Sequence, residues 1–207
     1  MQYENTPGLS LDKDHKYWFE EENILGVSEV IVDNRLESDK WFTETDSSRG
    51  IAIHTVLAGV ARGLTFDWDL LDPDLHGWVH SGIDYLAYLI ADGAVILGVE
   101  VSRFNPLHRV AGTIDLIALW RGYEWILDYK SGKASGVTRF RLGAYDMILG
   151  PTENRKPRKR AAIELQKDGG KAKLKEYNGV EFFHDGNRFL SYLVTTRDHR
   201  QFGPKGD

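Results

Sequence analysis

The sequence predicts an α/β fold with a central mixed β-sheet flanked by α-helices. Two segments of the first half have the helical spacing of apolar residues, and the periodicity changes to that of strands after Gly93. Three strand-like segments then follow in succession, and a helix, a hairpin and a last helix complete the chain. Such an order is typical of helices packed on one sheet, and 207 residues fit a single domain.

The first half is expected to supply an extension and two helices. Residues 1–45 are polar, and we expect a partly irregular extension that packs on the core. Within it, Ile24–Val32 is rich in branched side chains and predicts a strand or a short helix. Residues 45–48 offer N-cap side chains to a helix over Gly50–Gly63. After an acidic connector, a second helix covers about His76–Asp92 and ends at the following glycine.

The middle of the chain is expected to form the centre of the sheet. Strands are predicted over Ala94–Phe104, Arg109–Trp120 and Glu124–Tyr129, with a hairpin turn at Arg121-Gly122 between the last two. A helix is predicted over about Thr138–Leu149, where a Gly-Pro pair stops it.

The last sixty residues are expected to add a hairpin and a helix. A basic linker precedes two strand-like segments, 161–166 and 171–177, which flank Asp168-Gly169-Gly170. An amphipathic helix over about Val180–Arg197 is expected to close the domain.

The composition excludes several classes of protein. The chain has no cysteine, which excludes disulfides, thiolate zinc sites and iron–sulfur clusters and suits a reducing cytoplasm. No apolar run has membrane-spanning length and the start has no signal-peptide pattern, so we expect no membrane association. The G-x-x-x-x-G-K-[ST] phosphate loop is missing, so we expect no use of ATP. We expect a cytoplasmic protein, in the host cytoplasm if a phage encodes it.

Charge is distributed unevenly along the chain. Residues 1–100 carry 6 Lys and Arg against 19 Asp and Glu, whereas residues 101–207 carry 20 against 12. A basic C-terminal half suggests a polyanionic partner, although many charged faces are only solvated.

Acidic side chains fall on all three central strands. Glu100 lies on the first, Asp115 on the second and Asp128 on the third, where Lys130 follows on the same face. Ionisable groups at the end of an apolar strand are costly unless they are paired or bind a metal. We expect Asp115 and Asp128 to hold a metal ion, joined by the Tyr129 carbonyl and by Glu100. Oxygen ligands favour Mg²⁺, and Mn²⁺ is expected to substitute for it.

These residue types fit the hydrolysis of a phosphodiester. A bound divalent ion lowers the pKa of a water and neutralises charge in the transition state, and Lys130 would orient the nucleophile or stabilise that charge. An isolated D-x-K pair is more often an ordinary ion pair at a strand end. The acids at strand-compatible spacing, Glu100 and Asp115, favour the metal site.

The motifs Gly112-Thr113-Ile114-Asp115 and 126–132 (ILDYKSG), together with Glu100, resemble the PD-(D/E)XK nuclease superfamily, in its RecB-type and phage-type exonuclease branch. The resemblance covers about residues 49–197. It implies a restriction-endonuclease-like core and metal-dependent DNA cleavage. It also implies an active-site histidine on an early helix, which His54 matches as a metal ligand or as an orienter of water or phosphate. On its own, such a histidine is more often a hydrogen-bonded core residue.

DNA contacts are predicted on a helix, a loop and a basic run. Arg141 and Tyr145 lie four residues apart on one helical face. They occupy the place of the family's Q-x-x-x-Y pattern, in which the tyrosine matches and the glutamine does not. A surface arginine and a half-buried tyrosine are the alternative. The basic residues expected to contact phosphates are Lys133, Arg155, Lys156, Arg158, Lys159 and Arg160.

The sequence therefore predicts a Mg²⁺-dependent DNA exonuclease without strong sequence preference, acting in recombination, repair or replication, with a recombination or replication protein as a further partner. Two alternatives stay open. One is a structure-selective endonuclease of the junction or flap type, and the other is a nuclease-like module that binds DNA without cleaving it.

Overall fold

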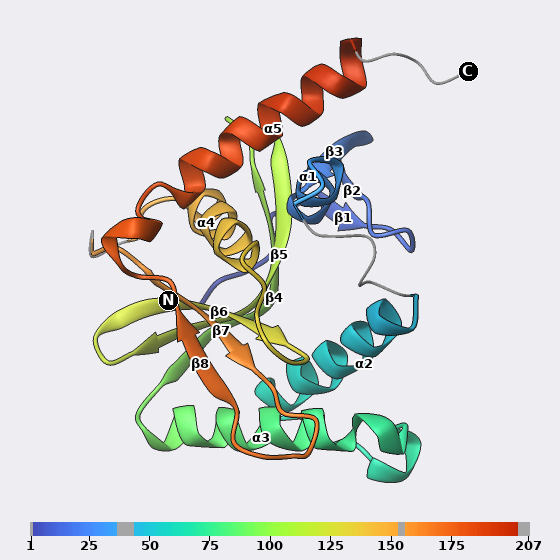
Figure 1. The fold of residues 1–207 in the computed structure, drawn as a ribbon, viewed down its shortest axis with the longest axis vertical. Coiled ribbons are helices and arrows are strands. Elements are labelled where there is room, and N and C mark those ends of the chain that lie inside the picture. Colours follow the sequence, from blue (N-terminus) through green and yellow to red (C-terminus); the bar gives the residue numbers. More distant parts are fainter. Residues whose placement is uncertain (1, 37–43, 153–155, 203–207) are drawn as a thin grey trace.

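The fold is described from a computed structural model, which covers residues 2–36, 44–152 and 156–202. These residues form an α/β structure with one mixed sheet of eight strands and helices on both of its faces (Figure 1). The predicted fold class is confirmed at this level. The strands are β1 (Leu9–Leu11), β2 (Tyr17–Phe19), β3 (Glu22–Gly26), β4 (Val95–Asn105), β5 (Val110–Trp120), β6 (Tyr123–Lys130), β7 (Lys159–Glu164) and β8 (Lys173–Glu176).

The sheet is organised around the long strand β5. Its order is β1-β2-β3-β5-β6-β7-β8, and β4 pairs with β5 along the other edge of that strand. The hairpin β5–β6 turns at Arg121 and Gly122, which both have positive φ, as the predicted turn requires. Strand β7 is parallel to β6, so the chain crosses over through α4 (Thr138–Leu149) between them.

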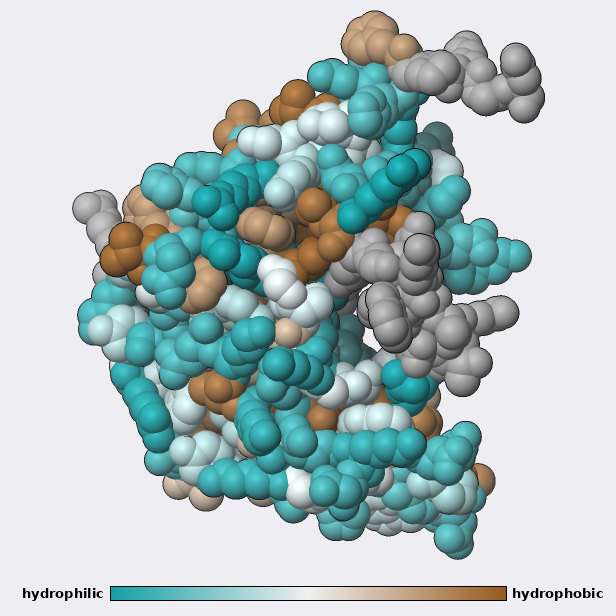
Figure 2. Space-filling view, in the orientation of Figure 1, coloured by the Kyte–Doolittle hydropathy of each residue, from teal (hydrophilic) through white to brown (hydrophobic). Residues whose placement is uncertain are grey.

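Helices cover the two faces of the sheet and enclose two hydrophobic clusters (Figure 1). Alternate residues of β6 divide between these clusters, since Leu127 packs with the first and Ile126 with the second. The first cluster involves α2 (Glu44–Ala61) and α3 (His76–Ala91), and the second involves α1 (Val27–Asp33), α4 and α5 (Asp185–Phe202). Hydrophilic side chains cover most of the face seen in Figure 2, and apolar ones gather beneath α5.

The N-terminal extension is more regular than its composition suggests. It supplies β1, β2, β3 and α1, so Ile24–Val32 contains both the end of a strand and a short helix. β1 and β2 are three residues each, too short for a periodic signal, and antiparallel pairing with each other and with β3 defines them. Ahead of them, the backbone of Tyr3 and Thr6 donates hydrogen bonds to Leu97 and Ser102 on the outer edge of β4.

The C-terminal elements follow the prediction with one change. β7 and β8 form the expected antiparallel hairpin around residues 168–170. The expected helix over Val180–Arg197 is divided into a 3₁₀ turn, Val180–Phe182, and α5, which begins at Asp185. The buried Asp185 carboxylate accepts two hydrogen bonds from Arg139 at the point where α5 starts.

Candidate metal centre

Two of the predicted acids lie opposite one another on β4 and β5. Val99 pairs with Leu116 and Val101 with Ile114, so the register places Glu100 across from Asp115. Glu100 has φ of 50°, a left-handed conformation that is uncommon for a residue with a side chain. Backbone strain of this kind concentrates at functional sites, where the surrounding structure maintains it.

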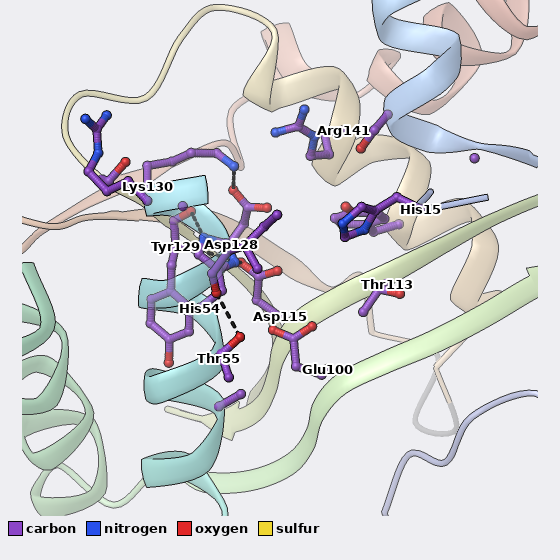
Figure 3. A pocket seen from close by; sticks show the side chains of 18 of the residues that line it. His15, His54, Thr55, Glu100, Thr113, Asp115, Asp128, Tyr129, Lys130 and Arg141 are labelled. Atoms are coloured by element: carbon purple, nitrogen blue, oxygen red, sulfur yellow. Dashed lines mark hydrogen bonds and ion pairs between the residues drawn. The ribbon is translucent and has the colours of Figure 1, made fainter. Parts of the chain in front are cut away.

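His54 reaches the same point from α2 (Figure 3). Its Nδ1 lies 3.3 Å from Oδ2 of Asp115, and its Nε2 lies 3.1 Å from the carbonyl oxygen of Tyr129. One ligand atom each from His54, Glu100 and Asp115 lies within 4.8 Å of the other two. The helix and the two strands thus bring one nitrogen and two carboxylates to a single point.

Asp128 and Lys130 lie beside this cluster and pair with each other (Figure 3). The structure therefore groups Asp115 with His54 and Glu100, whereas Asp128 forms an ion pair with the lysine two residues later. Tyr129 stands between Asp128 and Lys130 in the chain and contacts the other group, because its N–H donates to Asp115 over 2.8 Å and its carbonyl faces His54. The site residues predicted on β4, β5 and β6 thus lie together, near the end of β6 that Lys130 forms.

The cluster perturbs the acid–base properties of its members. Burial and the nearby Asp115 carboxylate raise the pKa of Glu100 to about 7. Burial alone would raise the pKa of Asp115, but the charge and hydrogen bond of His54 outweigh it and lower that pKa. Burial likewise opposes a charge on His54, yet Asp115 raises the pKa of the imidazole.

The donor set fits a divalent cation. Oε1 of Glu100 is buried and has no hydrogen-bond partner among the described residues, which is costly unless another ligand satisfies it. Carboxylate and carbonyl oxygens with one imidazole suit Mg²⁺ or Mn²⁺ better than thiolate-seeking metals. His54, Glu100, Asp115 and the Tyr129 carbonyl are the groups that would hold such an ion.

The cluster lies in a pocket of about 870 Å³. One wall comes from α2, which contributes Arg49 and Thr55 around His54, and Arg62 follows directly after the helix. The other walls come from the β1–β2 hairpin, the start of α1, the loop of residues 131–135 and α4. A polar network continues the floor away from the acids, because Tyr17 and Ser102 both hydrogen-bond the Thr113 hydroxyl over 2.8 Å.

Three predicted DNA contacts line this pocket: Lys133, Arg141 and Tyr145. Lys133 is exposed on the loop after β6, and Arg141 is half-buried on α4. Tyr145 exposes only 6% of its surface, and burial raises its pKa well above the usual value. It therefore serves as part of the wall and offers little surface on which a base could stack.

The basic run lies away from this pocket, and the prediction of phosphate contacts is wrong for two of its members. Lys159 pairs with Trp125 and Glu164 with Lys130, so Lys159 starts β7 roughly 17 Å from the site end of β6. Arg158 and Arg160 expose only 6% and 8% of their surface. They are structural residues with internal partners, and not the expected phosphate contacts.

Four residues of the basic run contact other parts of the protein. Arg158 contacts Glu124, Asp146 and the Tyr3 hydroxyl, while Arg160 donates to two backbone carbonyls near β8. Lys156 and Lys159 lie over the ring of Tyr123. Arg155 falls outside the described residues.

Sequence reasoning missed several pocket residues. Thr113 precedes Asp115 by two positions on one strand and therefore shares its face, a signal that was available. Arg49 lies five residues before His54 on α2 and stacks on Trp78, with 4.9 Å from guanidinium carbon to ring centroid. His15 and Tyr17 had no such signal, because only the tertiary fold brings the β1–β2 hairpin here.

No helix in the described part of the chain combines the length and apolarity needed to cross a membrane. A scan against protein-family models and a search of the curated proteins both find no match to this chain.

Proposed function

We propose that this protein is a divalent-metal-dependent deoxyribonuclease, and specifically an exonuclease without strong sequence preference. The observation that carries the proposal is the convergence of His54, Glu100 and Asp115 within 4.8 Å, beside the Asp128–Lys130 pair. A buried carboxylate oxygen without a partner in that cluster calls for a cation. A lysine beside such a cation is a combination suited to phosphodiester hydrolysis.

The order of the strands supports a restriction-endonuclease-like core. Antiparallel β4, β5 and β6 are followed by the crossover helix α4 and by β7, which is parallel to β6. The acids lie on the three antiparallel strands, and Lys130 ends the third. The PD-(D/E)XK resemblance of the motifs implies the same residue types on the same elements, which supports this proposal.

In this proposal, one set of residues binds the ion and another contacts the substrate. When bound, a divalent ion would polarise the phosphate and lower the pKa of a water. His54, Glu100 and Asp115 would hold that ion, with the Tyr129 carbonyl as a fourth donor. The Lys130 ammonium, fixed by Asp128, would donate to the phosphate or to the attacking water.

The cations around the pocket support a polyanionic substrate. Arg49, Lys133 and Arg141 line the same pocket as the acids. Their arrangement suits the DNA backbone, and we propose binding through phosphates rather than base edges. Recombination, repair or replication is the proposed setting of this activity.

Cleavage assays test the activity. Lys130→Ala and Asp115→Asn should each lower the cleavage of end-labelled DNA in Mg²⁺ by at least about a hundredfold. The matched controls Lys173→Ala and Asp198→Asn change exposed residues outside the pocket and should cleave like the wild type. Circular dichroism verifies that each variant is folded. Full activity in folded Lys130→Ala would remove this residue from the proposed mechanism.

Metal binding provides a readout that needs no substrate. Titration with Mn²⁺, followed by electron paramagnetic resonance, should reveal a site that Asp115→Asn and Glu100→Gln weaken by tenfold or more, while Asp198→Asn leaves it unchanged. An unchanged Mn²⁺ affinity in both site variants would refute the proposed ligand set.

The mode of cleavage is tested with DNA that has no ends. A covalently closed single-stranded circle should remain intact under conditions that degrade its linear form. Cleavage of the circle would favour the structure-selective endonuclease. If neither form is cleaved while Mn²⁺ still binds, the non-catalytic DNA-binding module becomes the better description.

A further inference from the structure

The loop between β1 and β2 is an ordered element held together by one carboxylate. Asp12 accepts hydrogen bonds through Oδ1 from the N–H groups of Asp14 and Lys16, each over 2.9 Å. Its Oδ2 accepts a third, 2.8 Å long, from Nε1 of Trp18. At the tip of the loop, His15 adopts φ of 56°, and its backbone N–H donates to the backbone carbonyl of Asp12. The loop thus fixes the backbone that carries the His15 ring.

The hairpin is fixed relative to the metal cluster. The Tyr17 hydroxyl lies 2.8 Å from the Thr113 hydroxyl, and Thr113 is two residues before Asp115 on β5. Behind it, the rings of Phe19 and Phe104 stack with 4.6 Å between their centroids. A residue on this hairpin therefore has a defined position with respect to the acids.

Two residues of the hairpin, Leu11 and His15, are exposed and line the pocket. In Figure 3 the His15 ring lies on the side away from α2, with Asp115 and Asp128 between it and His54. An imidazole at this place offers an N–H donor across the pocket from the acids, and Leu11, 43% exposed, offers an apolar surface on the same hairpin. One donor next to one apolar contact matches the phosphate and sugar of a nucleotide.

We propose that the β1–β2 hairpin forms a nucleotide subsite next to the metal cluster. His15 binds the phosphate of a linkage neighbouring the one that is cut, and Leu11 packs against the adjoining sugar. Asp12 is a positioning residue that acts through His15. This inference rests on the proposed nuclease function, because it takes the bound polyanion to be DNA.

The test scans one phosphate at a time. A fluorescent single-stranded oligonucleotide is prepared with a neutral methylphosphonate at each successive linkage, and its affinity is measured in Ca²⁺ buffer after a gel has verified that it stays intact. For the wild type, one linkage, besides any that Lys133 and Arg141 contact, should lower the affinity at least about tenfold, the effect of one lost hydrogen bond to a charged group. The same substitution should have no effect on His15→Gly, which has already lost the donor.

His15→Asn serves as the matched variant. Asparagine tolerates the left-handed backbone and supplies an N–H donor, so it should restore the sensitivity of that linkage. His184→Ala removes an exposed histidine that lies outside the pocket and should give the wild-type profile. Asp12→Ala should weaken binding in the wild type and add nothing in a His15→Gly background, as expected for a residue that acts through His15.

The outcomes separate this inference from the proposed function. A wild-type scan without a sensitive linkage, or a His15→Gly scan in which every sensitive linkage of the wild type stays sensitive, would overturn the subsite. Either result can occur in a protein that cleaves DNA in Mg²⁺. A wild type that cleaves no DNA would instead count against the nuclease proposal, whatever the scan shows.

Discussion

His54 lies between two groups of the candidate centre, with Nδ1 3.3 Å from an Asp115 oxygen and Nε2 3.1 Å from the Tyr129 carbonyl. Both of these neighbours accept hydrogen bonds and neither donates one to the ring. An imidazole satisfies both only when both of its nitrogens carry protons. The raised pKa of His54 agrees with this arrangement. A divalent ion would have to replace the proton that faces Asp115.

Metal affinity should therefore increase with pH. A protonated His54 cannot ligate, and Glu100, whose pKa is raised to about 7, is largely protonated at pH 6. We expect Mn²⁺ to bind at least about tenfold more tightly at pH 8 than at pH 6, with release of protons. Calorimetry in two buffers of different ionisation enthalpy counts those protons. Equal affinities at the two pH values would contradict this account of the centre.

Glu100→Gln should stabilise the protein in the absence of metal. The folded-state pKa of Glu100 is about 7 and its ordinary value is 4.5, so the folded state binds the proton more tightly. Stability from this group is therefore complete below pH 4.5 and is lost as the pH rises through 7. At pH 8 in EDTA, we expect the variant to gain about 1–2 kcal/mol in the free energy of unfolding, after allowance for solvent screening.

Thermal unfolding checks this prediction. The gain should shrink towards pH 4.5, where the carboxyl is protonated in both states. In saturating Mn²⁺ the order should reverse, because the wild type keeps a ligand that glutamine replaces poorly. A variant that is less stable than the wild type at pH 8 in EDTA would show that the buried charge is compensated in the free protein.

Of two basic residues, one should affect the stability of the protein and the other its binding of DNA. Arg158→Ala leaves Glu124 and Asp146 without their buried partner, so we expect a loss of about 3 kcal/mol in the free energy of unfolding. Lys133→Ala should leave stability unchanged, because Lys133 is exposed, and should reduce the salt dependence of DNA affinity by about one charge.

Denaturant titration and binding at several salt concentrations separate the two effects. If Arg158→Ala reduced the salt slope while its stability remained that of the wild type, Arg158 would be a phosphate contact after all.

Replacing Gly77 with alanine should destabilise the protein, whereas the same replacement of another helical glycine, Gly59, should not. A Cβ at Gly77 would lie 1.7 Å from the Lys167 carbonyl oxygen, where the β7–β8 hairpin rests on α3. Gly77→Ala should therefore cost more than about 2 kcal/mol, since the backbone of the hairpin must move. Gly59→Ala in α2 meets only a Leu64 carbon at 4.0 Å and should stabilise by about 0.5–1 kcal/mol. Chemical denaturation of the pair measures both, and equal effects would contradict the close approach.

The parts of the site that depend on local pattern could be predicted from the sequence. Glu100, Asp115 and Asp128 stand out because charged residues interrupt strands that are otherwise apolar, and the antiparallel pairing of β4, β5 and β6 follows from their adjacency in the chain. The spacing of Asp128 and Lys130 on one strand face also makes their ion pair a local alternative. The approach of His54 to Glu100 and Asp115 could not be predicted in this way. It depends on how α2 approaches the sheet, and no local pattern encodes that approach.

The errors also have a common physical cause. Arg158 and Arg160 were interpreted from a run of like charges, which usually indicates a solvated surface. Their partners, among them Tyr3 and Glu124 for Arg158, are distant in sequence, so no local pattern indicates that these two side chains are buried. The hairpin that carries His15 escaped notice for the same reason.

The backbone of residues 3–6 lies along the outer edge of β4, and Tyr3 and Thr6 donate to its carbonyls. Without this short segment, an eleven-residue strand would present its free edge to solvent. Open edges of that length recruit strands from other molecules. A variant without residues 3–6 would then be prone to self-association and precipitation, so recombinant production benefits from keeping this segment.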